Sequence, residues 1–261
     1  MAEKGARKGL RDKLKSGQAV AGVIMKIPSP DMAELLAYSG LDLLVADAEH
    51  GPITPETCQQ LVRALRASHS DTDLIVRVPS LDPSVILRYI DTGIDGVQLP
   101  HVWNGSQAQA AIDGLFHPPL GTRGLAGGRW ADYGFREPLL ERIGLAAESM
   151  VVVAQMEDKE LLNHISEVIR IARIDVFYIG PVDLAASMGH TGNSDHADVG
   201  TAVKRLFEEF SATGRTVGTI ARSAEDCAQK LADGYRFVLV NAENAFLEGP
   251  RRIAAVVRAA L

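Results

Sequence analysis

The stretch LIVRVPSLDPSVILRYIDTGIDGVQL, residues 74–99, contains a complete unit of the fold. Its ends are short apolar runs, Leu74–Val78 and Gly96–Leu99, which are typical of buried strands. Between them, Pro83–Thr92 repeats apolar residues at helical spacing, and Asp82 before the proline suits a helix start. The stretch therefore predicts a strand, a helix and a second strand, which is the βαβ unit of a parallel sheet.

The same alternation extends over the whole chain. Six further runs of strand character are Ala19–Met25, Leu43–Ala46, Met150–Met156, Asp175–Ile179, Thr216–Ile220 and Phe237–Val240. The other stretches of helical spacing are Asp31–Ser39, Pro55–Ala67, Ser106–Leu115, Glu160–Ile171, Val199–Ala212, Ala224–Ala232 and a last one that runs to Leu261. Glycines suited to helix ends stand at Gly40, Gly93, Gly214 and Gly234.

Eight strands alternating with helices predict a single (β/α)8 TIM barrel that spans residues 1–261. An open, doubly wound sheet is the competing fold, but no G-x-G-x-x-G follows the first predicted strand. Residues 1–18 are expected to form a short helical extension before the barrel. The long segment 117–149 separates the fourth and fifth strands and includes the glycine-rich stretch 121–128, which is typical of a lid or an interface element.

Composition and charge exclude several classes of function. The net charge of −6 gives no reason to expect nucleic acid or an anionic membrane as a partner. No apolar run approaches the ~20 residues that span a bilayer. The charged N-terminus lacks the apolar core of a signal peptide, so a cytoplasmic location is expected. Cys58 and Cys227 lie far apart in the sequence and are expected to be passive thiols.

Polar residues gather where the predicted strands end, and barrel active sites lie at the carboxyl ends of strands. The residues concerned are Asp47, Glu49 and His50 after the second strand, Arg77 in the third, Gln155 and Glu157 in the fifth, and Asp183 after the sixth. One carboxylate in such a place is as often a helix cap, and a lone histidine is more often structural. A guanidinium inside an apolar strand, however, is costly without a partner. Together these residues predict an active site.

The chemistry of this set favours proton abstraction next to a carbonyl group. Glu157 and Asp183 offer hard oxygen ligands, which suit Mg²⁺ or Mn²⁺ and leave other divalent ions open. A sparsely held ion leaves positions for the carboxylate and ketone of a 2-oxo acid. Free N–H groups at the Pro181-Val182-Asp183 turn can hold that carboxylate, Arg77 can stabilise an enolate oxygen, and His50 can move the proton. The set predicts an aldol or retro-aldol step.

Five motifs, in order, resemble the HpcH/HpaI family of class II, pyruvate-dependent aldolases, whose type reaction cleaves 4-hydroxy-2-oxoheptanedioate. The resemblance runs from about Val20 to Val240. The motifs are VADAEH (45–50), VRVP (76–79), PPLGTRG (118–124), AQME (154–157) and IGPVDLA (179–185). Each motif is weak alone, but the ordered set is specific.

The resemblance implies a role for each matching residue. Glu157 and Asp183 would bind a divalent metal ion (Mg²⁺, Mn²⁺ or Co²⁺), His50 would be the acid and base, and Arg77 would polarise the ketone. Asp91 would orient the histidine, although the residues alone suggest only a solvated helix position. Asp47, Glu49 and Gln155 would hold metal-bound waters or the substrate carbonyl. Relatives assemble as hexamers, trimers of dimers, with the last helix exchanged between neighbours, so a homo-oligomer is expected.

The chain departs from the family pattern at three places. Gly22-Val-Ile-Met-Lys26 lacks the aromatic residue that many relatives carry after the glycine. His101 follows Pro100 where relatives usually have an apolar residue, and Val240-Asn-Ala-Glu243 replaces a common Gly-Ser-Asp. These departures leave the reaction class intact, with a pyruvate-like 2-oxo acid and an aldehyde as substrates. The identity of the aldehyde stays open.

Three alternatives also stay open. A lyase or decarboxylase of the citrate lyase β or malyl-CoA lyase type would use the same enolate, and Arg123, Arg129 and Arg136 are scattered candidates for holding a CoA pyrophosphate. Schiff-base chemistry would need Lys26, which is more simply a rim residue that binds an acidic substrate tail. The third is a catalytically silent barrel. Arg123 is equally a substrate contact, in its own or a neighbouring subunit, and a cation that orders its loop.

Overall fold

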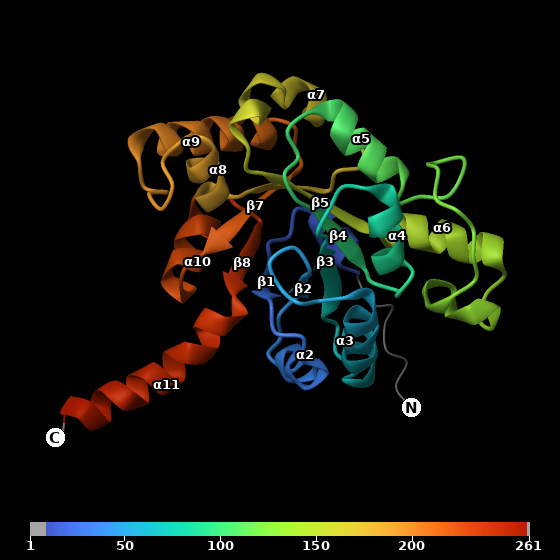
Figure 1. Cartoon of the computed structure of the whole chain (residues 1–261), viewed down its shortest axis with the longest axis horizontal. Helices are drawn as coiled ribbons and strands as arrows, with labels where there is room; N and C mark the ends of the chain where they lie inside the picture. Colours follow the sequence, from blue (N-terminus) through green and yellow to red (C-terminus); the bar gives the residue numbers. More distant parts are fainter. Residues whose placement is uncertain (1–8, 260–261) are drawn as a thin grey trace.

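The strands form a closed parallel barrel in the computed structural model, which describes residues 9–259 (Figure 1). Eight strands follow one another around the barrel in chain order, and the last pairs with the first. They are β1 (Val20–Met25), β2 (Leu43–Asp47), β3 (Asp73–Arg77), β4 (Gly96–Leu99), β5 (Val151–Met156), β6 (Val176–Ile179), β7 (Thr216–Ala221) and β8 (Phe237–Asn241). The predicted (β/α)8 fold is confirmed, and each strand boundary lies within one residue of its expected position.

Helices connect the strands and surround the barrel (Figure 1). They are α2 (Pro30–Ala37), α3 (Pro55–Ala67), α4 (Pro83–Ile90), α5 (Gly105–Asp113), α6 (Leu139–Ser149), α7 (Ile165–Ile169), α8 (Pro181–Ser187), α9 (Ala197–Ser211), α10 (Ala224–Ala232) and α11 (Ala242–Ala259). Ser29, Thr54 and Asp82 cap α2, α3 and α4 through side-chain oxygens, each followed by a proline in the first turn. The caps expected from the sequence are thus present.

The apolar residues form two layers on either side of the strands. Residues of one parity, such as Val45, Ile75, Val153 and Leu239, pack together inside the barrel. Residues of the other parity, such as Leu44, pack against the helices in a larger cluster. Because successive side chains of a strand point to opposite faces, both layers follow from strands that are apolar throughout.

The N-terminal helix α1 (Leu10–Lys15) lies at the amino ends of the strands. Leu10 and Leu14 belong to the cluster inside the barrel, and the backbone N–H of Leu10 donates to Asp73 Oδ2 at 2.9 Å. Arg11 forms an ion pair with Asp175, with 2.9 Å between Nε and Oδ1. The expected short helical extension is present from Leu10 onward, and its earlier part, residues 1–8, lies outside the described residues. The helix covers this end of the barrel, so the site must open at the other.

Two segments differ from the sequence expectations. The single helix expected over Glu160–Ile171 is divided at His164 into the 3₁₀ helix η2 (Lys159–Asn163) and α7. The long segment 117–149 contains the 3₁₀ helix η1 (Arg129–Gly134) and the whole of α6, so it is less irregular than expected. Pro138 immediately precedes α6, and only Ala147 of that helix is buried. Its weak burial pattern explains why apolar spacing did not reveal this helix.

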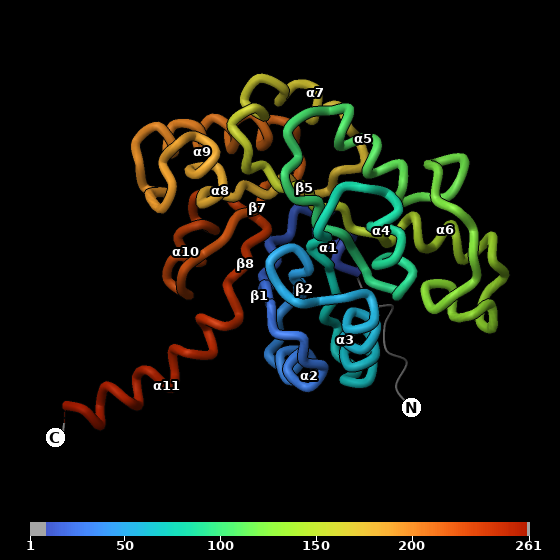
Figure 2. The backbone as a smooth tube through the Cα atoms, in the orientation of Figure 1, coloured from blue at the N-terminus to red at the C-terminus, as the bar shows by residue number. Residues whose placement is uncertain are grey.

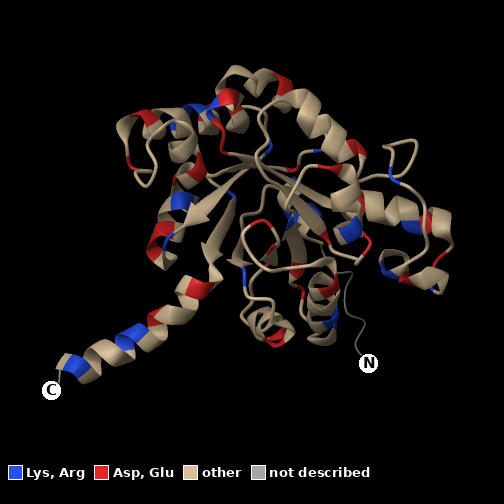
Figure 3. Cartoon of the chain, viewed as in Figure 1, with Lys and Arg blue, Asp and Glu red and all other residues tan. Residues whose placement is uncertain are grey.

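The last helix, α11, leads away from the barrel (Figures 1 and 2). Its acidic residues lie in the half nearer the barrel, and its basic residues lie in the half toward the C-terminus (Figure 3). Only Ala242 of this helix is buried, whereas Leu247, Ile253, Val256 and Val257 are exposed. Across residues 9–259, the structure contains no helix with the length and apolar character needed to cross a bilayer.

Candidate active site

A cavity of about 280 Å³ opens at the carboxyl ends of the strands. Most of the site residues expected from the sequence line it: His50, Arg77, Gln155, Glu157, Pro181, Val182 and Asp183, together with Lys26, Tyr178 and Asn241. The parity of the strands explains this gathering. Val151 and Val153 face the barrel interior, and Gln155 and Glu157 continue the same face beyond the apolar layer.

Arg77 is held in place by two acidic side chains, one on the neighbouring strand β2 and one in the turn that follows it. Asp47 and Arg77 are register partners on β2 and β3. Arg77 Nε donates to Asp47 Oδ1 at 2.9 Å and Nη2 donates to Oδ2 at 2.6 Å, while Glu49 Oε2 lies 3.3 Å from Nε. Asp47 also accepts the backbone N–H groups of Glu49 and His50, each at 3.1 Å. The guanidinium is therefore oriented by its bidentate partner before any substrate binds.

The protonation states of this pair follow from its contacts. Burial alone would raise the pKa of Asp47, but the hydrogen bonds and charge of Arg77 outweigh it and hold that pKa below its ordinary value. Burial likewise opposes the charge of Arg77, yet Asp47 and Glu49 raise the pKa of the guanidinium above its usual range. Both groups are charged at neutral pH, so the cavity contains a fixed positive donor.

Glu157 is held by a chain of amide groups across two strands. Gln98 on β4 donates to Gln155, whose Nε2 donates to Glu157 Oε2 at 2.6 Å. On its other side, Glu157 Oε1 accepts the backbone N–H of His101 at 2.9 Å. These contacts fix the carboxylate of a residue that is 2% exposed and leave it directed toward the cavity.

His101 joins two of the acidic residues at the cavity edge. Its Nδ1 lies 3.4 Å from Glu157 Oε1, and its Nε2 lies 3.1 Å from Glu49 Oε1. The backbone at His101 has a φ of 48°, in the left-handed region that non-glycine residues seldom adopt. This turn after β4 places the imidazole between the two carboxylates. The sequence marked His101 only as a departure from the family pattern.

The donor set at Glu157 and Asp183 fits a divalent cation. Burial is the main cause that raises the pKa of Glu157, and repulsion from Asp183 adds to it. Among the described residues, the buried Oε2 of Glu49 has no hydrogen-bond partner, although Arg77 Nε lies 3.3 Å from it. Glu157 is buried and Asp183 is partly buried. Neighbouring carboxylates without a compensating charge repel each other, and a cation between them removes that cost. Oxygen donors of this kind suit Mg²⁺ or Mn²⁺.

Gly180 gives the carboxylate of Glu157 its space. A Cβ atom at this position would lie 2.8 Å from Glu157 Oε2 and 3.1 Å from its Cβ. We expect Gly180→Ala to displace the carboxylate and lower metal affinity by about tenfold, the scale of losing a supporting contact. Gly144→Ala is the matched control, because a Cβ there meets nothing within 4 Å. Equal metal affinities of the two variants, measured by calorimetry, would show that the close approach has no role.

His50 is the most open of the expected catalytic residues. Its side chain is 52% exposed, and its Nε2 lies 3.8 Å from Glu49 Oε2. Asp91, which the family resemblance pairs with His50, follows the end of α4. It accepts a 2.6 Å hydrogen bond from Arg123 Nη2. Arg123 also lies over the Trp130 ring, 4.7 Å from its centroid. The structure thus brings Asp91 and Arg123 together, and neither is among the residues that line the cavity.

The scattered arginines of the sequence also come together, but not at this cavity. Arg123, Arg129 and Arg136 line a second cavity of about 580 Å³ together with Arg66 and Arg142. Its other lining residues include Asp95 and Met150, which directly precede β4 and β5. It therefore lies toward the amino ends of the strands, whereas Glu157 and Asp183 lie beyond the carboxyl ends. The arginines are not placed to hold a CoA pyrophosphate beside the candidate catalytic residues of the same chain.

Comparison with known proteins agrees with this geometry. The family description "HpcH/HpaI aldolase/citrate lyase" matches residues 22–247. The chain belongs to this family. It is 30% identical over 239 residues to a hydroxypyruvate/pyruvate aldolase of Paraburkholderia phytofirmans, with 90% of this chain and 91% of the relative covered. It is 30% identical over 250 residues to a 4-hydroxy-2-oxo-heptane-1,7-dioate aldolase of Salmonella typhimurium, with 95% and 94% covered.

A solved structure shares the architecture closely. The crystal structure of an HpcH/HpaI aldolase/citrate lyase family protein from Burkholderia cenocepacia superposes with a TM-score of 0.91 at 30% identity, and covers 95% of this chain and 98% of that one. The family resemblance expected from the five motifs is confirmed, and with it the class of enzyme, an aldolase that acts as a carbon–carbon lyase. The roles of individual residues stay predictions.

Sequence reasoning missed several residues of the cavity wall. Gln98, which supports Gln155, lies on the inward face of β4, two residues after Gly96. Tyr178 and Asn241 line the cavity from β6 and β8. Burial raises the pKa of the Tyr178 hydroxyl above its ordinary value, with Arg77 opposing the shift, so the group stays neutral. The parity of the strands is the signal that would have found all three.

Proposed function

We propose that this chain is a divalent-metal aldolase that forms and cleaves 4-hydroxy-2-oxo acids through the enolate of pyruvate or a closely related 2-oxo acid. The observation that carries the proposal is the orientation of Arg77 by Asp47 in the cavity that Glu157 and Asp183 also line. A fixed cationic donor beside a pair of cation-binding carboxylates suits a substrate that develops negative charge on a carbonyl oxygen. The aldolase names of relatives at 30% identity support the same reading.

The chain's own residues divide the work as follows. In cleavage, the C3–C4 bond breaks, a base takes the proton of the C4 hydroxyl, and the bonding electrons move onto the C2 oxygen. Arg77 uses Nε and Nη2 to hold Asp47, and we assign its Nη1 to the C2 oxygen. His50, half-exposed at the cavity mouth, is the group we assign to proton transfer.

Glu157 and Asp183 would hold the metal ion, with Mg²⁺, Mn²⁺ and Co²⁺ as candidates. When bound, such an ion supplies a Lewis acid for the carboxylate and ketone oxygens of the 2-oxo acid. Gln155 fixes Glu157 from within the barrel, and Glu49 completes the acidic edge beside His101. The expected contact of the substrate carboxylate with the turn at Pro181, Val182 and Asp183, where α8 begins, stays a prediction.

Proton exchange tests the proposal without knowledge of the aldehyde. Chelator-treated protein is incubated with pyruvate in D2O, and loss of the methyl signal is followed by ¹H NMR with and without added Mg²⁺, Mn²⁺ or Co²⁺. We expect exchange that requires both protein and metal, because enolate formation releases a methyl proton to solvent. Absence of exchange with all three ions, for pyruvate and hydroxypyruvate alike, would contradict the proposal.

Two controls separate the remaining alternatives. Lys26 lines the cavity, so borohydride treatment in the presence of pyruvate reports on Schiff-base chemistry. A covalent pyruvate adduct would refute the metal-enolate mechanism. A citrate-lyase-type activity would appear as cleavage of a CoA ester, which the position of the arginine-lined cavity does not favour. A catalytically silent barrel would show neither metal affinity nor exchange.

His101 provides a prediction about pH. Burial raises the pKa of Glu157, and His101 opposes the shift through its backbone N–H and its imidazole. Glu157 must be deprotonated to hold a cation, so activity is lost as pH falls through its pKa. We expect His101→Leu to remove the imidazole contribution, raise that pKa further and move the acid limb of the rate profile to higher pH. His164→Leu, at another half-exposed histidine, is the control and should leave the limb in place.

The exposed helix α11 suggests how copies of the chain associate. Its exposed apolar residues, such as Ile253 and Val256, are 68% and 66% exposed, and a face of this kind is typical of an interface. We propose a homo-oligomer in which α11 packs on a neighbouring copy, with the hexamer of the family as the expected form. In such an assembly the Asp91–Arg123 pair would be free to meet a neighbour's cavity. Truncation after Asn241 should then reduce the number of chains per particle, calculated from the mass measured by light scattering and the mass of the shortened chain.

A further inference from the structure

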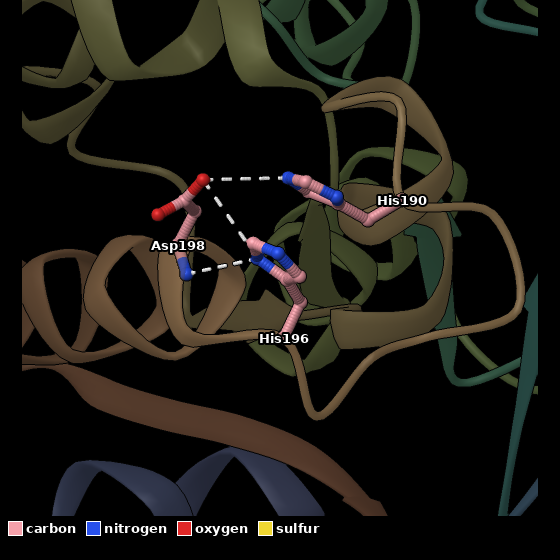
Figure 4. Close-up of side chains that lie close together, drawn as sticks. All are labelled: His190, His196 and Asp198. Carbon is pink, nitrogen blue, oxygen red and sulfur yellow. Dashed lines mark hydrogen bonds and ion pairs between the residues drawn. The ribbon is translucent and has the colours of Figure 1, made fainter.

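A second group of possible metal ligands lies at the loop between α8 and α9, and none of its residues lines the cavity of the candidate active site. It consists of His190, His196 and Asp198, and the ligand atoms of these three residues all lie within 4.8 Å of one another (Figure 4). His190 Nε2 is 3.5 Å from Asp198 Oδ2, and His196 Nδ1 is 3.7 Å from the same oxygen. Two imidazoles and a carboxylate form a mixed nitrogen and oxygen donor set, unlike the oxygen set of Glu157 and Asp183.

We propose that His190, His196 and Asp198 form a binding site for Zn²⁺ or another borderline transition-metal ion such as Co²⁺, Ni²⁺ or Cu²⁺. Imidazole nitrogen is the donor that these ions favour over Mg²⁺ and Mn²⁺. Ligand bonds of about 2.0–2.1 Å in a tetrahedral site place neighbouring donor atoms about 3.3–3.4 Å apart. The two measured separations from Asp198 are only a few tenths of an ångström longer.

The backbone positions these side chains before any ion binds. After α8, the N–H of His190 donates to Ala185 O at 2.7 Å and that of Gly189 donates to Ala186 O at 3.0 Å. This pattern, with Gly189 at a φ of 85°, is a Schellman-type helix end. At the other end of the loop, His196 is the N-cap residue of α9. Each imidazole is thus anchored at a helix terminus rather than on a free loop.

The two rings already lie in a defined arrangement. They stack with centroids 3.6 Å apart and an interplanar angle of 14°, and Asp198 faces their nitrogen edges (Figure 4). Because a metal ion binds in the plane of an imidazole ring, the two nearly parallel rings turn relative to each other when both bind one ion. His196 Nδ1 accepts the backbone N–H of Asp198 at 3.2 Å. That hydrogen bond requires an unprotonated Nδ1, which is also the form that binds a metal. A bound ion would take this lone pair in place of a long hydrogen bond.

The group is open to solvent, so water can supply the ligands that three protein side chains leave unfilled. The side chains of His190, His196 and Asp198 are 26%, 37% and 68% exposed, so an ion can enter and water can complete its coordination. A role in capping α9 alone would need only His196. Stacking a second imidazole on the first brings together two groups that repel when protonated, whereas coordination by one ion uses both as neutral ligands.

Zinc binding by matched variants tests the proposal. The starting protein is the Glu157→Gln/Asp183→Asn double variant, which removes the other candidate site, after treatment with chelator. We expect it to bind about one zinc ion per chain, and His190→Phe in the same background to weaken that binding at least about tenfold. Phenylalanine retains a flat ring for stacking but has no ligand atom. His164→Phe is the control, because His164 contacts a single carboxylate, with 2.8 Å between Nδ1 and Glu167 Oε1.

Copper provides a spectroscopic reading of the same ligands. In the double variant, the electron paramagnetic resonance spectrum of one equivalent of Cu²⁺ should show coupling to nitrogen, and this coupling should be reduced by His190→Phe. Equal zinc affinity with and without His190, or no zinc binding in the double variant, would overturn the proposal. In the otherwise unaltered chain, His190→Phe should leave Mg²⁺-dependent pyruvate exchange unchanged. Failure of the aldolase proposal would not alter the zinc result.

Discussion

Arg77→Ala is expected to slow metal-dependent exchange of pyruvate methyl protons by about 10²–10³-fold, the usual effect of removing one donor to a developing oxyanion. Metal affinity should change little, because the guanidinium is held by Asp47 and Glu49 and not by the proposed metal ligands, Glu157 and Asp183. The two readings come from ¹H NMR in D2O and from calorimetry with Mn²⁺. Wild-type exchange in this variant would refute the role of Arg77.

The same substitution should also reduce stability. Asp47 is 0% exposed, and loss of its partner leaves a buried carboxylate with only the two backbone N–H groups of Glu49 and His50. Breaking a buried ion pair costs about 3–5 kcal/mol, and these remaining donors place the expected loss near the lower value. Urea unfolding at pH 7 measures it. Arg77→Lys is the control: it retains the charge but not the bidentate contact, so it should recover stability more than exchange.

The stability from this pair depends on pH in a defined direction. Arg77 holds the pKa of Asp47 below the ordinary value of 3.8. A carboxyl group with a lowered pKa in the folded protein contributes stability above its unfolded pKa and loses it as pH falls through the folded value. In Arg77→Ala, burial without the guanidinium raises the pKa of Asp47. The difference in unfolding free energy between wild type and variant should therefore be full at neutral pH and shrink as pH falls through that raised pKa, where the variant's Asp47 becomes protonated.

The barrel could be predicted from the sequence because its strands are apolar on both faces. Runs such as Leu43–Ala46 and Phe237–Val240 cannot be exposed, and their alternation with helical stretches leaves few architectures other than a barrel. Helix α6 could not be predicted, since it buries only Ala147 and follows a glycine-rich segment. Apolar spacing reveals a helix only when the helix packs a stripe of side chains into the core.

The candidate site was predictable where a strand ends in a charged residue. Glu157 and Asp183 follow β5 and β6, and the position of those strand ends identifies them. His101 is different, because its contacts with Glu49 and Glu157 depend on a left-handed backbone conformation that a single sequence does not encode visibly. A turn of this kind is decided by the packing around it.

The pairing of Asp91 with Arg123 could not be read from the sequence either. Thirty-two residues separate the two in the chain, and nothing in the spacing indicates their contact. Family resemblance implies that Asp91 acts on His50, which stays a prediction. Within its own chain, Asp91 accepts a hydrogen bond from Arg123. Among the described residues, Arg123 Nε is buried without a hydrogen-bond partner. A neighbouring copy could reach this pair, as proposed for the oligomer.

Glu157→Gln is the second substitution with a large expected effect. It removes one of two proposed metal ligands, so metal affinity should fall by at least about 100-fold, beyond the cost of losing an outer hydrogen bond. Exchange of pyruvate methyl protons should then fall to the rate of metal ions alone. Glutamine retains the size of the side chain, and Gln155 and the His101 N–H still lie beside it. Calorimetry and ¹H NMR measure the two effects.

Without metal, the same variant should become relatively more stable as pH rises. Burial and Asp183 raise the pKa of Glu157 above its ordinary value of 4.5, so the folded protein binds a proton more tightly than the unfolded chain. The free energy of unfolding of the metal-free wild type therefore decreases from about pH 4.5 up to the raised pKa, and glutamine lacks this loss. Urea unfolding in chelator across this range should show the difference growing in favour of Glu157→Gln. Saturating Mn²⁺ should reverse the order, because the ion binds only the folded wild type. A pH-independent difference, or no effect of Mn²⁺, would mean that Glu157 is a structural carboxylate and not a metal ligand.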